Sequence, residues 1–195
     1  MRISGVLLGL LALPLWAGPL TQGERDYALS QLQATRKMFL DTVAGLSEAQ
    51  WKYKPADNRW SIAEIGAHLI LSEDFMTAEL KKRLEAPAGE PRFKREDDEK
   101  LYAAIVDRSQ PRSAPQALEP PPAPMPRDEA ARKFAAVRDR TLDYVRTTQD
   151  DLRGRVSGDG AMAHDAYQWV LYIAGHTERH MAQVKEVMAS PGFPR

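Results

Sequence analysis

The stretch Ser61–Leu80, "SIAEIGAHLILSEDFMTAEL", decides the fold class of this chain. Ser61 is followed three residues later by Glu64, a capping box in which each side chain binds a backbone amide that a helix start leaves unpaired. Apolar residues then recur at helical spacing, which predicts a helix that begins at Ser61 and continues to about Leu84. One buried stripe should run along it: Ile62, Ile65, Leu69, Met76 and Leu80.

The same reasoning predicts three more long helices, over Arg25–Ala44, about Asp128–Thr148 and about Asp165–Met188. Between Ala86 and Arg127 lie nine of the fourteen prolines, which favour extended backbone over helix. Within this segment only "EDDEKLYAAIVDR" has the acidic start and basic end of a short helix. We therefore predict an all-α fold, an up-down four-helix bundle with a long proline-rich crossover between the second and third helices.

Composition limits the classes of partner and site. Lys plus Arg and Asp plus Glu each total 27, so the chain has no overall charge that would attract nucleic acid or an anionic membrane surface. There is no cysteine, which excludes disulfides, thiolate metal ligands and a protein thiol nucleophile. Any metal site must therefore use His, Asp or Glu.

The N-terminal residues 1–17 have the order of an export signal. Arg2 is basic, Val6–Leu15 is apolar, and Ala17 is a small residue at which a signal peptidase could cut. The apolar run is shorter than the ~20 residues that span a bilayer. We expect a cleaved signal peptide at 1–17, one domain over 20–195, export to the periplasm or medium, and no stable membrane insertion after cleavage; a retained anchor is the alternative.

The stretch Ile173–Val184, "IAGHTERHMAQV", carries two histidines four residues apart. At about 100° per residue, His176 and His180 lie near the middle of an apolar arc roughly 120° wide. Burying two imidazoles without partners costs on the order of a few kcal/mol each. Either one divalent cation binds both rings, or hydroxyls and carbonyls of neighbouring helices do.

Three other side chains complete the set of candidates. His68 could supply a third metal ligand, although it lies on the shoulder of its helix's apolar stripe and periodicity alone does not select it. Glu73 falls within that stripe, so it is a hydrogen-bond acceptor for a ligand, a general base, or the partner of an arginine on another helix. His164 precedes the last helix, and we interpret it as a solvent-facing or capping residue.

Two blocks of sequence together resemble the DinB-like metal-binding four-helix bundles. The first is "W-x-x-x-P-x-x-x-x-W-S-I-A-E-I-G-A-H-L-x-x-x-E" over Trp51–Glu73, and the second is "H-x-x-x-H-x-x-Q" over His176–Gln183. The resemblance covers about Leu20 to Pro194. It implies a site in which His68, His176 and His180 hold a divalent transition metal, with water in the open positions. We expect zinc or nickel first, although three imidazoles also accept iron and copper.

The resemblance leaves the reaction open, because relatives include thiol-dependent S-transferases and metal-dependent hydrolases. A zinc-protease motif, H-E-x-x-H, is excluded because Thr177 follows His176. Small thiols are scarcer outside the cytoplasm, so we favour an exported metal-dependent hydrolase with Glu73 as candidate general base. The alternatives are an S-transferase and a non-catalytic metal- or ligand-binding module. The substrate, a small molecule, is not identified by the sequence, and a homodimer is expected only because such assemblies are common.

Overall fold

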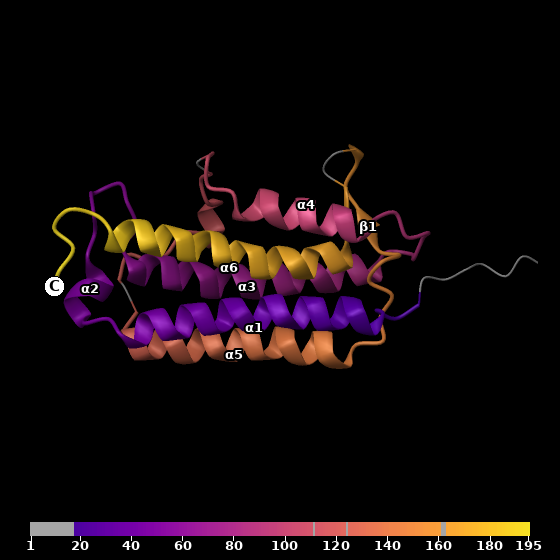
Figure 1. The fold of residues 1–195 in the computed structure, drawn as a ribbon, viewed down its shortest axis with the longest axis horizontal. Helices are drawn as coiled ribbons and strands as arrows, with labels where there is room; N and C mark the ends of the chain where they lie inside the picture. The colour runs from indigo at the N-terminus through magenta and orange to yellow at the C-terminus, as the bar shows by residue number, and fades with distance from the viewer. Residues whose placement is uncertain (1–17, 111, 124, 161–162) are drawn as a thin grey trace, which may run out of the picture.

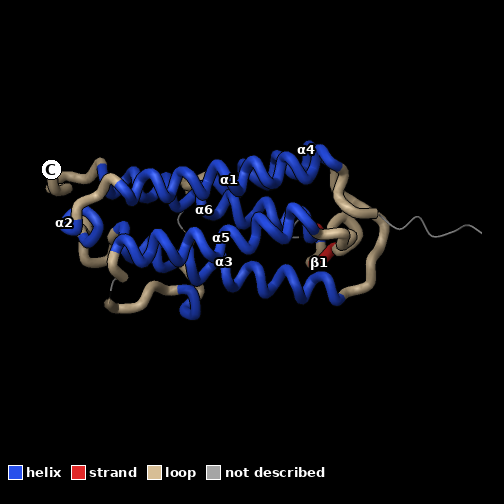
Figure 2. Tube along the Cα trace, turned by 90° about the horizontal axis from the view of Figure 1, so that it is seen from below, coloured by secondary structure: helices blue, strands red, loops and turns tan. Residues whose placement is uncertain are grey.

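The computed structural model describes residues 18–110, 112–123, 125–160 and 163–195. Four long helices lie side by side along the molecule (Figures 1 and 2): α1 (Gln22–Ala44), α3 (Ile62–Glu85), α5 (Arg127–Thr147) and α6 (Ala166–Met188). Both α1 and α3 pack against α5 and α6. The all-α class and the packing of helices far apart in sequence are as predicted.

Local sequence signals account for where these helices begin. The backbone N–H of Glu64 donates to Ser61 Oγ at 3.2 Å, and that of Ser61 donates to Glu64 Oε2 at 2.7 Å, so the predicted capping box starts α3. The amide of Gln168 donates to Asp165 Oδ1 at 2.7 Å, which makes Asp165 the N-cap of α6. The predicted stripe of α3 is buried in full.

Shorter elements connect the long helices. A short helix α2 (Glu48–Lys52) precedes α3, and the segment between α3 and α5 contains α4 (Arg95–Val106) and the 3-10 turn η1 (Gln116–Leu118). Figure 1 shows α4 lying along α6, while α3 and α5 run in the same direction. That the prolines of this segment hold it as a crossover stays a prediction. A short antiparallel pair of strands, β1 (Val156–Ser157) and β2 (His164–Asp165), precedes α6. The sequence did not predict this pair.

A layer of polar side chains crosses the bundle between two apolar clusters. Arg138 of α5 donates from Nε to Glu73 Oε1 at 2.8 Å and from Nη2 to Thr177 Oγ1 at 2.8 Å. Its Nη1 donates to the carbonyl oxygen of Leu32 at 2.9 Å and to Thr35 Oγ1 at 2.7 Å. One guanidinium thereby joins all four long helices. We call this group the polar layer: Thr35, Glu73, Arg138, Thr141 and Thr177.

The predicted signal peptide, residues 1–17, lies outside the described residues. Across the part of the chain that the structure describes, no helix has the length and apolar character needed to cross a membrane.

Candidate metal centre

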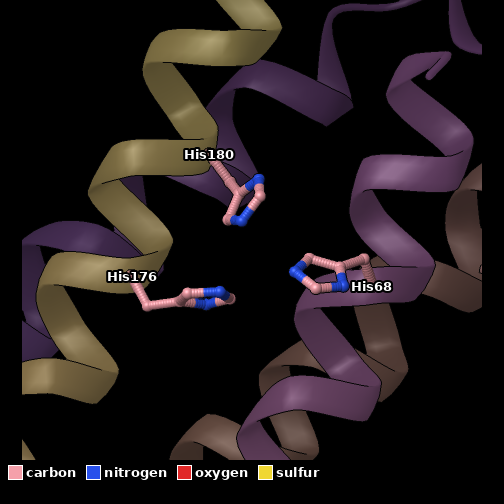
Figure 3. Close-up of side chains that lie close together, drawn as sticks. All are labelled: His68, His176 and His180. Atoms are coloured by element: carbon pink, nitrogen blue, oxygen red, sulfur yellow. The ribbon is translucent and has the colours of Figure 1, made fainter. Parts of the chain in front are cut away.

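Three histidines from two helices meet on the side of the bundle where α3 faces α6. Figure 3 shows the rings of His68 on α3 and of His176 and His180 on α6 pointing toward one another. Each ring offers one nitrogen, and these nitrogens all lie within 4.8 Å of one another. The structure thus brings together the three residues singled out in the sequence, and we call them the histidine cluster. This group could hold a metal ion.

Hydrogen bonds fix which nitrogen of two rings carries the hydrogen. His68 Nδ1 lies 2.7 Å from the carbonyl oxygen of Leu118, and His180 Nδ1 lies 2.8 Å from Oε1 of Gln183. Because both oxygens only accept, each Nδ1 carries the hydrogen and each Nε2 keeps its lone pair. Histidines that bind metals are oriented by the same kind of outward hydrogen bond.

Burial keeps the cluster uncharged. Desolvation lowers the pKa of His68, and it lowers the pKa of His176 well below the ordinary value, with repulsion from the other two rings as the next cause. For His180, desolvation and then repulsion from His68 lower the pKa to about 3. All three imidazoles are therefore neutral at pH 7, which is the form that binds metals.

The donor set fits a divalent transition metal. His176 Nδ1 is buried and has no hydrogen-bond partner among the described residues, an arrangement that costs about 1–3 kcal/mol when nothing compensates it. Nitrogens bound at about 2.0–2.1 Å to one tetrahedral ion lie roughly 3.4 Å apart, so small side-chain rotations bring this set onto one ion. Three neutral nitrogens suit zinc, nickel, iron or copper better than calcium or magnesium.

A cavity of about 760 Å³ opens beside the cluster. Its lining includes Trp60, whose ring centroid lies 4.9 Å from that of His68 and 6.4 Å from that of His180. Trp60 belongs to the block that resembles the family, but no spacing in the sequence places it beside the histidines. Trp51, by contrast, is fully buried in the core and donates from Nε1 to the carbonyl oxygen of Met125 at 2.8 Å.

Glu73 is the partner of an arginine on another helix, which is the third of its three interpretations. Its Oε1 accepts hydrogen bonds from Arg138 Nε and from Thr141 Oγ1, both at 2.8 Å, and it does not line the cavity. Its neighbour Ser72 does line the cavity, with Oγ 3.3 Å from His68 Nε2. The only sequence signal for Ser72 was its position, four residues after His68 on the same helix.

His164 does not cap α6, because Asp165 occupies that position. Its ring stacks on Trp169, with centroids 5.3 Å apart and planes 16° from parallel. The fourth histidine of the chain therefore lies outside the cluster.

A comparison with protein families identifies the family of this chain. A family model described as the DinB superfamily matches residues 31–184, a span that includes α3, α5, most of α1 and α6, and the three histidines. The chain belongs to the DinB superfamily. This DinB-superfamily protein is also 30% identical, over 154 residues, to the uncharacterized protein YuaE of Bacillus subtilis (strain 168). That alignment covers 74% of this chain and 87% of YuaE. No solved structure matches the chain significantly.

Proposed function

We propose that this DinB-superfamily protein is a metal-dependent enzyme, and specifically a hydrolase, in which His68, His176 and His180 bind one divalent transition metal. Zinc and nickel are the first candidates. The observation that carries the proposal is that three neutral imidazoles converge on one point while two of them are tied outward through Nδ1. When bound, such a metal lowers the pKa of a coordinated water toward neutrality and polarises a substrate carbonyl.

The surroundings support catalysis over a purely structural role. A structural zinc site is closed by four protein ligands, whereas a catalytic site uses three and keeps a position open. Here three ligands lie beside a cavity of about 760 Å³ that can admit a small molecule. Glu73 forms a buried ion pair with Arg138 and does not line the cavity, so we do not assign the role of general base to it.

The segment between α3 and α5 has a part in this proposal. Its residue Leu118 supplies the carbonyl that orients His68, and residues on either side of it line the cavity. We propose that its prolines keep the segment extended as a crossover, so that this carbonyl reaches the ring. The predicted signal peptide supports action outside the cytoplasm, which favours a hydrolase over a thiol-dependent S-transferase.

Metal content is the first test. Protein that is purified without chelators and then incubated with zinc or nickel should hold about one equivalent of transition metal, measured by elemental analysis. His176→Ala and His180→Ala should abolish stoichiometric binding, and His68→Ala should do nearly the same, with helical circular dichroism unchanged. His164→Ala is the matched control and should bind like the wild type, because His164 lies outside the cluster.

Less than about a tenth of an equivalent in the wild type would reject the site. Full binding by the His68 variant would reject the third ligand. Activity is tested separately, with ester, amide and phosphoester substrates before and after metal removal. Protein that holds a full equivalent but shows no metal-dependent turnover would reject the hydrolase and leave a metal-binding module.

A further inference from the structure

Cations outnumber carboxylates around the cavity. Four arginines and two glutamates line it: Arg59, Arg108, Arg112, Arg179, Glu119 and Glu186. Glu186 is shared, because Oε1 accepts from Arg108 Nε at 2.8 Å while Oε2 accepts from Arg108 Nη2 at 3.0 Å and from Arg59 Nη2 at 3.3 Å. Because two guanidinium groups share one carboxylate, one positive charge is not compensated.

The other two arginines increase this surplus. Arg179 is buried and donates to the carbonyl oxygens of Asp107 and Gln110, which satisfy its hydrogen bonds without neutralising its charge. Burial and then the nearby positive charges of Arg108 and Arg112 lower its pKa, against a smaller opposing effect of the Asp107 carboxylate. Arg112 is exposed and has no carboxylate within ion-pair distance in the described parts of the chain. The cavity therefore attracts an anion before any metal ion is bound.

One end of the cavity is aromatic. The rings of Trp169 and Tyr172 stack with centroids 5.2 Å apart and planes 19° from parallel, and Tyr172 stacks on His176 at 6.2 Å and 16°. Phe75 also lines this cavity and is 45% exposed, although it is a large apolar residue. Stacked rings beside an exposed phenyl ring form a surface for a planar apolar group.

The order of these groups along α6 has a consequence for the substrate. Trp169 and Tyr172 come first, His176 and His180 follow, and Glu186 with its two arginines comes last. A molecule lying along the helix would therefore place its planar end on the aromatic rings and its charged end among the arginines. Its middle would lie against the histidines.

We propose that the substrate is an organic anion with a planar, aromatic or conjugated body at one end, its acidic group at the other, and the bond to be hydrolysed between them. The location of the reaction rests on the proposed metal site, whereas recognition of the anion does not. In the hydrolysis of an amide of this form, water supplies the hydroxyl that bonds to the acyl carbon and the proton that leaves on the amine. An N-aroyl amino acid has this layout.

A matched pair of fluorescent probes tests the proposal. Dansylglycine has an aromatic end and a carboxylate, and dansylglycinamide differs only in lacking the charge. Fluorescence titration of the full chain should show dansylglycine binding about tenfold more tightly, the equivalent of about 1.4 kcal/mol. Metal-free and zinc-loaded protein are both measured, and zinc should tighten dansylglycine further.

Two surface variants locate the bound probe. Arg112→Gln should weaken dansylglycine severalfold and leave dansylglycinamide unchanged, whereas Phe75→Ser should weaken both. Arg132→Gln and Leu71→Ser are the matched controls, since both side chains are exposed and lie outside the cavity lining. All four positions are exposed, so loss of binding will not reflect unfolding, which circular dichroism checks.

Equal affinity for the two probes, or wild-type binding by both cavity variants, would overturn the anion proposal. If the wild type takes up metal but lacks the charge preference, this inference fails and the metal site stands. If it takes up no metal, the metal site fails, and the titrations of metal-free protein still decide the inference.

Discussion

The polar layer and the histidine cluster both place polar side chains inside the bundle, but the side chains of the polar layer bind one another, and only Glu73 Oε2 among them lacks a partner in the described residues. Arg138 finds partners on three other helices, and the distances lie between 2.7 and 2.9 Å. His68 and His180 are held by outward hydrogen bonds through Nδ1, and Ser72 Oγ lies 3.3 Å from His68 Nε2. His176 Nδ1 has no partner among the described residues. Buried groups that stabilise a fold pair with one another, whereas groups that wait for a ligand leave lone pairs directed at a common point.

The largest effect should come from breaking the polar layer. Arg138→Met removes the cation and leaves the Glu73 carboxylate buried without its partner, which should lower the free energy of unfolding by about 3–5 kcal/mol. Urea denaturation measures it. Arg140→Met is the matched control on the same two helices, because its ion pair with Asp74 is exposed and should contribute only about 0–1 kcal/mol. A loss no larger than the control's would mean that the polar layer does not support the fold.

A smaller effect should come from loosening the outward bonds of the histidine cluster. Gln183→Leu removes the acceptor that orients His180, so metal affinity should fall about 10- to 100-fold while stability without metal changes little. Isothermal titration with zinc measures this, and Lys185→Leu, an exposed change two residues further along the helix, is the control. Unchanged affinity in the Gln183 variant would show that the ring needs no such support.

The smallest effect concerns the stability of the metal-free protein at acidic pH. The unfolded chain takes up protons on its histidines near pH 6.5, but the folded chain resists because burial lowers the pKa of His180 to about 3. Stability of the metal-free protein is therefore complete above about pH 6.5 and falls as pH decreases toward 3, by about 1.4 kcal/mol per pH unit for each such histidine. His180→Asn should reduce that slope by one histidine's share between pH 5 and 6.5.

Asp165 acts in the opposite direction, since burial raises its pKa to about 6, but it is common to both proteins and cancels in their difference. Identical slopes in the wild type and the His180 variant would contradict a neutral, buried ring.

The sequence predicts this fold well because its signals are local. The capping box at Ser61 and the stripe of α3 lie within single helices, and the structure reproduces both. Glu73 shows where such reasoning ends: a carboxylate in an apolar stripe has to be paired, but only the packing of α3 against α5 shows that the partner is Arg138.

The site is harder to predict because its parts come from separate segments. Periodicity does not select His68, and the family resemblance supplied it. The arginines around the cavity come from three segments of the chain, so no spacing in the sequence relates them. Nor could any residue pattern have identified the group that orients His68, since it is a main-chain carbonyl.

That carbonyl gives the connection between α4 and α5 an unusual kind of constraint. Because every amino acid carries the same main-chain oxygen, exchanging Leu118 for another residue can leave the bond to His68 intact. Adding or deleting a residue between Val106 and Leu118 would instead bring a different peptide unit, at a different angle, to the ring. Relatives of this protein should therefore tolerate varied residue types at position 118 more readily than a changed length of this connection.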